Sequence, residues 1–183
     1  ETRLMGQRVF CVRGDDAARM FYAPGRFTRR GAIPISALTL LQDWPSVQML
    51  DDAPHRHRRD LFLRLLTDRD GVGRLLSIFQ EEWQQATRAW QDLPEVVLHD
   101  AVPEVLCAAV CRWAGVPLAP EELPERTREF LAMIEGAGRI GPQNWAGQRQ
   151  RSRAETWARN LIEHTRAGAI ASDANTVLAA IAF

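Results

Sequence analysis

The residues best suited to bind a charged ligand lie in one stretch, Asp51–Leu66, where histidine and arginine gather between positions 55 and 59. His55 and Arg59 are four residues apart, so on a helix they lie one above the other on the same face. Both side chains donate hydrogen bonds, and the planar arginine fork matches a carboxylate. The spacing therefore predicts a helical site for an acidic group.

The two faces of this predicted helix differ in character. At roughly 100° per residue, one face is predicted to be solvated and to carry ion pairs four residues apart: Arg56, His57, Asp60 and Arg64. The opposite row begins with cations and continues with apolar side chains: His55, Arg59, Phe62 and Leu66. A buried arginine without a partner is costly, and no acidic residue of this segment faces that way. We therefore expect the counter-charge to come from elsewhere in the fold or from a ligand. A merely solvated basic helix end and a DNA-recognition helix are the alternatives.

Other reactive residue types do not define a second site. The cysteines are odd in number, so disulfide stapling is not expected and a reducing, cytoplasmic location is the default: Cys11, Cys107 and Cys111. Two histidines two positions apart, His55 and His57, point in different directions on a helix. The other two, His99 and His164, are far from them along the chain. No metal site is therefore predicted.

The 183 residues fit one domain or one lobe of a larger one. All 23 cationic residues are arginine and they balance 23 acidic residues, so a global basic field for nucleic acid is absent. The longest apolar runs are shorter than the ~18 residues that a membrane span needs. The chain opens at Glu1 without methionine and stops in the apolar run 177–183. We expect further protein to cover that run.

The pattern predicts a mainly helical protein with a small β element. Short runs on either side of Gly6 predict two strands, and Asp15 and Asp16 precede a short helix over 17–22. Residues 31–50 are mostly apolar but punctuated by proline, which is typical of a loop or irregular helix that lines a pocket.

Helices dominate the rest of the chain. An amphipathic stripe predicts a helix over 72–90: Leu76, Phe79, Trp83, Ala86 and Trp90. Residues 102–113 are apolar nearly all round, which predicts a central buried helix ended by Gly115 and Pro117. Two further helices, 121–138 and 151–167, are predicted to be joined by a connector over 141–145. The basic run 148–153 is interpreted as a solvated helix start.

The segment with His55 and Arg59 resembles the C helix of cytochromes P450, in which such a pair binds the heme propionates. Three further runs resemble the bacterial fatty-acid peroxygenase branch of that family: residues 27–34 (FTRRGAIP), 47–51 (VQMLD) and 141–145 (GPQNW). The resemblance covers essentially the whole chain in order. It implies the N-terminal half of a P450 fold, with residues 1–183 forming part of a heme-thiolate domain.

The resemblance also implies a function. Such enzymes bind heme b and use hydrogen peroxide to hydroxylate or decarboxylate fatty acids, without an obligatory redox partner. By position, His55 and Arg59 would hold the propionates, and Gln48 would lie over the distal face of the heme. The acyl-chain tunnel would be lined by Ile33, Ala37, Leu41, Gln42, Ile134 and Ala137. Gln42 stands where an apolar or aromatic residue is common, which would alter the site of oxidation.

Some parts of the family's machinery are missing from this segment. A P450 needs an axial cysteine thiolate in a glycine-rich loop, and none of the three cysteines has that context. The helix bearing the Arg-Pro pair that binds the substrate carboxylate is also missing. We therefore assign no catalytic residue here. The alternative functions are a P450 monooxygenase served by a redox partner, and a helical regulatory or nucleic-acid-binding protein whose 55–59 cluster contacts phosphates.

Overall fold

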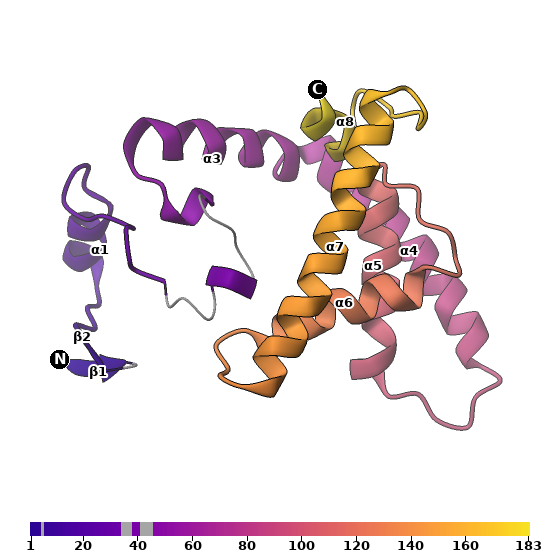
Figure 1. Ribbon diagram of the computed structural model, residues 1–183, viewed down its shortest axis with the longest axis horizontal. Helices are drawn as coiled ribbons and strands as arrows, with labels where there is room; N and C mark the ends of the chain where they lie inside the picture. Colours follow the sequence, from indigo (N-terminus) through magenta and orange to yellow (C-terminus); the bar gives the residue numbers. More distant parts are fainter. Residues whose placement is uncertain (5, 34–37, 41–45) are drawn as a thin grey trace.

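The structure is a computed structural model that describes residues 1–4, 6–33, 38–40 and 46–183. At the N-terminus β1 (Thr2–Leu4) pairs antiparallel with β2 (Gln7–Val9), and Thr2 lies opposite Val9. Gly6 between them has φ 78°, a left-handed conformation that glycine adopts readily. α1 (Asp15–Tyr22) follows, with both aspartates in its first turn. The two strands and this short helix were predicted from the sequence and are confirmed (Figure 1).

A single long helix leads from this N-terminal part to the helical body (Figure 1). The short 3-10 helix η1 (Val47–Met49) contacts α3 (Asp52–Leu66), which in turn contacts α4 (Arg69–Trp90). α4 begins at the N-cap residue Asp68, whose Oδ2 accepts a hydrogen bond of 2.8 Å from the backbone N–H of Gly71. The cluster at 55–59 is therefore carried by the first half of α3, as predicted.

The helical body contains α4, α5 (Leu98–Ala114), α6 (Leu123–Gly136), α7 (Pro142–Arg166) and α8 (Val177–Ala182). α5 packs against both α4 and α6, while α7 packs against α6 and α8. The buried apolar side chains that join these helices are Val105, Ala109, Cys111, Trp113, Ala154, Leu161, Leu178, Ala179 and Ala182. Trp113 also fixes α5 to the start of α4, because its indole Nε1–H donates a buried hydrogen bond of 2.8 Å to the carbonyl of Gly71.

Two predictions about helix ends had different outcomes. α5 ends at Gly115 with φ 77°, which confirms the predicted left-handed stop. α7 begins at Pro142 rather than at 151, so the segment 141–145 is the first turn of the helix and not a connector. Proline is well placed there because the first helical N–H has no intrahelical partner anyway.

The predicted burial of two helices was partly wrong. Leu76 in the proposed stripe of α4 is 62% exposed, so this position faces away from the body. α5 was predicted to be buried all round, but Leu106 and Val110 are 47% and 46% exposed. α5 is therefore buried on one side only among the described residues. No helix in the described part of the chain combines the length and the apolarity needed to cross a bilayer.

Candidate functional site

The start of α3 is tied to the segment before it through Asp51. The hydroxyl of Thr28 donates to Asp51 Oδ2 at 2.5 Å, and the backbone N–H of Arg29 donates to Asp51 Oδ1 at 3.0 Å. The guanidinium of Arg29 lies 3.6 Å from the same carboxylate oxygen. The Thr28 hydrogen bond, followed by the bond from Arg29, lowers the pKa of Asp51. Asp51 stands at the N-cap position of α3, but its carboxylate does not cap the helix.

His55 lies one turn into α3 and is half-buried. Burial lowers the pKa of His55, and the positive charges of Arg29 and Arg59 lower it further, while Asp51 acts in the opposite direction. Burial and the surrounding positive charge therefore both disfavour the charged imidazolium. An anionic ligand placed here would reverse that balance and would favour the charged imidazolium.

Three residues predicted to bind a cofactor come together at one hollow of about 810 Å³, which we call the α3 hollow. Gln48 reaches it from η1, and His55 and Arg59 reach it from α3. Phe62 and Leu66, the apolar end of the same helical row, line it as well. The hollow thus combines hydrogen-bond donors with an apolar wall.

The α3 row is open rather than buried. Arg59 is exposed, and Phe62 and Leu66 are 46% and 48% exposed. The sequence argument that a buried arginine requires a counter-charge therefore does not hold for this chain alone. Arg59 has no ion pair within 4.0 Å among the described residues. Its guanidinium is available to a ligand.

The opposite face of α3 is exposed, as predicted, but it lacks the predicted ion pairs. In the described parts of the structure, no salt bridge joins Asp60 to Arg56 or to Arg64. Such surface pairs contribute little even when they form. The two faces of α3 therefore differ because only the face with Phe62 and Leu66 carries apolar side chains and lines the α3 hollow.

The residues predicted to line an acyl-chain tunnel are placed in part. Ile33 is half-buried, and Ala137 is half-buried just after the end of α6. Ile134 is 62% exposed and opens onto an apolar groove of about 430 Å³ between α5, α6 and α7. The remaining three predictions, Ala37, Leu41 and Gln42, lie outside the described residues.

That groove, which we call the α5–α6 groove, is lined mainly by apolar side chains, with Thr127 among them: Pro103, Leu106, Cys107, Val110, Cys111, Ala114, Val116, Thr127, Phe130, Leu131, Ile134 and Trp157. Cys107 and Cys111 are one turn apart on α5, and their thiols are hydrogen-bonded. This hydrogen bond lowers the pKa of Cys107 and raises that of Cys111, with burial adding to the rise. Cys11 is exposed and lies two residues beyond β2.

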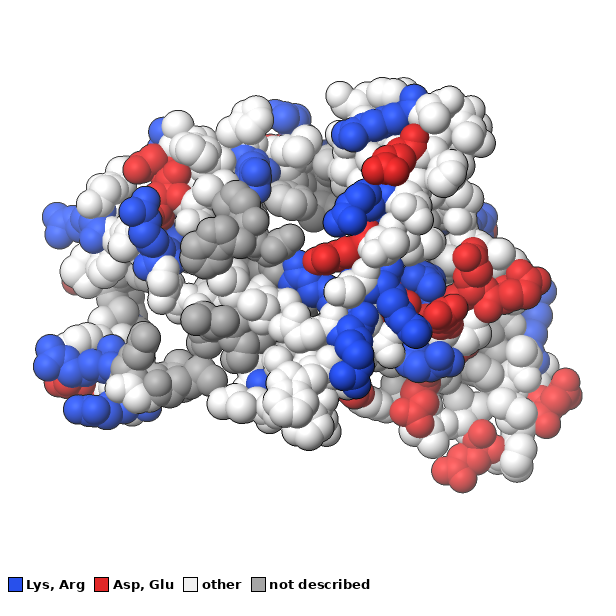
Figure 2. Space-filling model, viewed as in Figure 1, with Lys and Arg blue, Asp and Glu red and all other residues white. Residues whose placement is uncertain are grey.

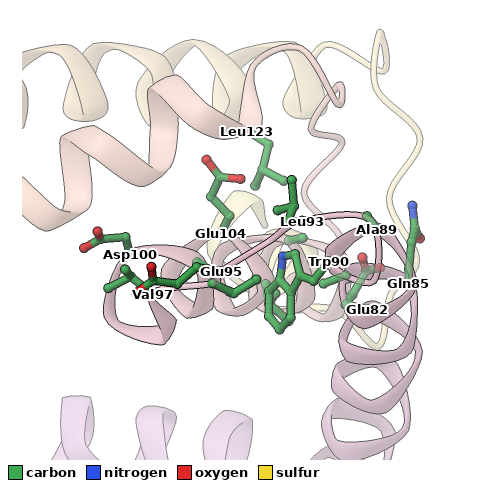
Figure 3. Close-up of a pocket in the computed structure, with 15 residues that line it drawn as sticks. Glu82, Gln85, Ala89, Trp90, Leu93, Glu95, Val97, Asp100, Glu104 and Leu123 are labelled. Carbon is green, nitrogen blue, oxygen red and sulfur yellow. The ribbon is translucent and has the colours of Figure 1, made fainter.

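A separate hollow of about 570 Å³ lies between α4, the segment after it and α5 (Figure 3). Trp90 and Leu93 contribute apolar surface, and Glu82, Glu95 and Glu104 contribute carboxylates. No group of three or more His, Cys, Asp or Glu side chains in the described residues is arranged to hold a metal ion. The carboxylates of this hollow thus form an acidic surface without metal-ligand geometry.

The basic run 148–153 lies inside α7 rather than at its start, and two of its three arginines have acidic partners. Arg151 Nε donates to Glu155 Oε1 at 2.5 Å, and Arg153 Nη1 lies 3.7 Å from Glu125 Oε1. Figure 2 shows arginine side chains over the crossing of α6 and α7 with acidic side chains among them. This mixed surface does not favour phosphate binding by α7, which needs unpaired cations.

No family model matches the chain. Solved structures do match it closely. A variant of cytochrome P450SP alpha (CYP152B1) matches at 37% identity with a TM-score of 0.91, over 99% of this chain and 44% of that one. Wild-type cytochrome P450EX alpha (CYP152N1) with myristic acid matches at 38% identity with a TM-score of 0.88, over 98% of this chain and 43% of that one. A variant of cytochrome P450 OleT in complex with arachidonic acid has a TM-score of 0.80 at 24% identity, over 85% of this chain and 37% of that one, which supports the fold alone.

The chain therefore forms part of a cytochrome P450 fold. Within that fold it is similar to CYP152 structures, at 37–38% identity. It spans less than half of the length of the structures that it matches. The resemblance and the mainly helical fold predicted from the sequence are confirmed, while the roles of individual residues stay predictions.

Proposed function

We propose that the complete protein containing this chain is a heme-thiolate peroxygenase that uses hydrogen peroxide to hydroxylate or decarboxylate fatty acids. The observation that carries the proposal is the α3 hollow, where Gln48, His55 and Arg59 meet beside an apolar wall. The similarity to CYP152 structures, one of which contains myristic acid, supports a fatty acid as the substrate. We also propose a cytoplasmic location and no obligatory redox partner.

The α3 hollow has the chemistry that heme b requires. Heme is an apolar macrocycle with two anionic propionates, so its edge needs cationic donors next to an apolar surface. Arg59 and His55 are such donors, and Phe62 and Leu66 supply the apolar surface. The lowered pKa of His55 fits this role, because a propionate would oppose the burial and the charges of Arg29 and Arg59 that now depress it.

The residues of this chain would bind and orient rather than react. His55 and Arg59 would hold the propionates, and the His55 imidazole would take up a proton as the anion arrives. The amide of Gln48 would offer a hydrogen bond on the distal side. Heme bound to a thiolate from the rest of the domain would supply the iron chemistry that activates peroxide. We assign no catalytic residue to this chain.

The cofactor assignment is tested by an Arg59→Ala variant of the complete protein. A charge-assisted hydrogen bond contributes about 1.5–3 kcal/mol, so heme should bind roughly ten- to a hundredfold more weakly. Arg64→Ala is the matched control, because Arg64 is exposed on the opposite face of the same helix. Heme occupancy is measured by absorbance after transfer to apomyoglobin. Equal retention of heme in the two variants would remove the role proposed for Arg59.

The reaction is tested with hydrogen peroxide, a saturated fatty acid and the purified complete protein, without any reductase. We expect hydroxylated acid, the terminal alkene, or both. Turnover only with a reductase and its electron donor would instead support a redox-partner-dependent monooxygenase. A heme-thiolate absorbance spectrum without turnover in either assay would contradict both reactions.

A further inference from the structure

The turn that joins α6 to α7 holds two large apolar side chains in solvent. Ile140 is 89% exposed, and Trp145 in the first turn of α7 is 61% exposed. Among the described residues, no other large apolar side chain is as exposed as Ile140. Figure 1 shows this turn at the end of α7 that lies away from α8, and Figure 2 shows that its surface is mostly uncharged. Apolar side chains displayed in this way mark a contact surface.

Hydrogen bonds fix the conformation in which the turn presents these side chains. Arg139 Nη1 donates to Gln143 Oε1 at 2.8 Å, which ties the turn to the start of α7. The backbone N–H of Trp145 donates to the carbonyl of Gly141 at 3.1 Å. Ile140 lies between these bonded residues in the sequence, so its side chain projects from an ordered turn. Binding through this turn would therefore cost little conformational entropy.

Arginines flank the apolar pair. Arg139 precedes Ile140, and Arg149 lies one turn beyond Trp145 on the same face of α7. Both arginines are exposed, and neither makes an ion pair within 4.0 Å among the described residues. No acidic residue occurs between Glu135 and Arg149. The surface formed by Arg139, Ile140, Trp145 and Arg149, which we call the α6–α7 tip, thus combines an apolar point with positive charge.

This combination fits an anionic lipid surface. Tryptophan and aliphatic side chains enter the boundary between headgroups and acyl chains, while arginines stay at the phosphates. Arg149 lies ~6 Å behind Trp145 along the axis of α7, so both side chains can reach their preferred layers at once. A second copy docked through the same surface would bring like charges together. A nucleic acid would need a row of cations, which the exposed Ile140 interrupts.

We propose that the α6–α7 tip docks the complete protein on an anionic membrane surface, with Ile140 and Trp145 at the headgroup boundary and Arg139 and Arg149 over the phosphates. Such peripheral docking requires no membrane-spanning helix. The docking itself is independent of the reaction. Its use, which is to take up fatty acid from the bilayer, rests on the proposed function. Acyl chains partition strongly into membranes, so a docked protein would meet its substrate where that substrate is concentrated.

The test measures binding of the complete protein to vesicles of phosphatidylglycerol and phosphatidylcholine, with phosphatidylcholine vesicles for comparison. Ile140→Ser should weaken binding to the anionic vesicles roughly tenfold or more, because an inserted apolar side chain is lost. Arg149→Gln should weaken it about fivefold at low salt and much less at high salt. The matched controls are Leu76→Ser, at a leucine of α4 that is 62% exposed, and Arg159→Gln, at an exposed arginine further along α7. Both controls should bind like the wild type.

Two further readouts locate the contact and connect it to the substrate. Brominated lipids in the vesicles should quench part of the tryptophan fluorescence of the wild type, and Trp145→Phe should lack this quenched part. With peroxide, KM for a long-chain fatty acid supplied in anionic vesicles should rise about tenfold in Ile140→Ser, in proportion to the lost binding. KM for a short fatty acid dissolved in water should not change.

Binding that requires anionic lipid and that falls in Ile140→Ser but not in Leu76→Ser supports the proposal. Because Ile140 is 89% exposed, its replacement should leave the fold intact. Wild-type protein that does not bind the anionic vesicles overturns the proposal, and so does binding that Ile140→Ser leaves unchanged. In the latter case, a change of oligomeric state in Ile140→Ser, measured by analytical ultracentrifugation, would assign the tip to a contact between copies.

The vesicle assay and the reaction fail separately. Weaker vesicle binding with an unchanged KM for the vesicle-supplied acid overturns the use of the tip in fatty-acid uptake. If the wild-type protein does not oxidise fatty acids with peroxide, the proposed function fails, and the vesicle data still decide whether the tip docks on lipid.

Discussion

The buried ion pair of α6 allows a quantitative prediction about stability. Arg126 Nη1 lies 2.6 Å from Glu129 Oε2, and the side chains are only 11% and 1% exposed. The guanidinium also lies over the ring of Trp157 in α7, 5.4 Å from its centroid. Nε of Arg126 and Oε1 of Glu129 are buried without a hydrogen-bond partner among the described residues. The pair is thus desolvated but only partly satisfied.

Replacing one member of the Arg126–Glu129 pair should lower the free energy of unfolding more than replacing both. Loss of one partner from a buried pair typically costs about 3–5 kcal/mol because the other charge stays buried. In Glu129→Leu, Arg126 keeps a second acid, Glu125, at 3.6 Å, so we expect the lower end, ~3 kcal/mol. Replacing both by Arg126→Met and Glu129→Leu removes the desolvation cost of both charges. It forfeits ~0.5–1 kcal/mol of cation–π attraction to Trp157, so the double variant should be near the wild type.

The assay is urea denaturation of the complete protein, with unfolding followed by the fluorescence of the α7 tryptophans Trp145 and Trp157. Glu135→Gln is the control, because Glu135 is exposed on the same helix. We expect the double variant to be about 2 kcal/mol more stable than Glu129→Leu. A double variant less stable than Glu129→Leu would refute the argument, since it would show that the arginine stabilises the fold without its acid.

The same carboxylate gives a pH dependence of defined sign. Burial raises the pKa of Glu129 above its usual value of 4.5, and Arg126 only partly opposes this. Between 4.5 and the raised value, the folded state holds a proton that the unfolded state has lost. The contribution of Glu129 to stability therefore falls as pH rises through this interval, and it is constant below it. Glu129→Gln should remove this slope, whereas Glu135→Gln should keep it.

Three further outcomes are expected. Gly115→Ala should destabilise the protein by ~2 kcal/mol or more in urea, because φ is 77° and the new Cβ would lie 2.7 Å from Thr176 Cβ; an unchanged midpoint would contradict the close approach. Trp113→Phe should lower the free energy of unfolding in urea by ~1–3 kcal/mol, since the buried 2.8 Å hydrogen bond of Trp113 to α4 is lost; an unchanged free energy of unfolding would argue against this. Cys111→Ala should raise the pKa of Cys107, whose thiolate now accepts a hydrogen bond from Cys111, and iodoacetamide labelling across pH would show a shift to higher pH or disprove it.

Local patterns accounted for much of the fold and for the centre of the site. The helix with His55 and Arg59 was predictable because the four-residue spacing depends only on nearby sequence. Gln48 was assigned through the family resemblance, and the structure brings it to the same hollow as both of them. The late start predicted for α7 has a local cause too, because Gly141 and Pro142 were interpreted as a connector rather than as a proline at the first helical position.

The features that were missed depend on contacts between distant segments. The Leu40 side chain packs beside Gly136 of α6 and Gly147 of α7. Both glycines are more than 90 residues from Leu40 in the sequence, and no periodic pattern connects them. The signal available was a glycine inside a helix, at Gly147, which is unfavourable unless another group needs the space. The exposure of Arg59 was also beyond local reasoning, because an apolar row predicts that a face will be covered but not which segment covers it.

The packed helical body of this chain also carries open apolar surfaces. Phe62 and Leu66 on α3 and Leu106, Val110 and Ile134 beside the α5–α6 groove are each 46–62% exposed. Soluble proteins rarely leave contiguous apolar patches uncovered unless something binds there. The chain spans 42–44% of the CYP152 structures that it matches. If heme occupies the α3 hollow, as proposed, the open apolar row and the cationic pair at 55 and 59 have one common cause, because the same cofactor would cover the first and pair with the second.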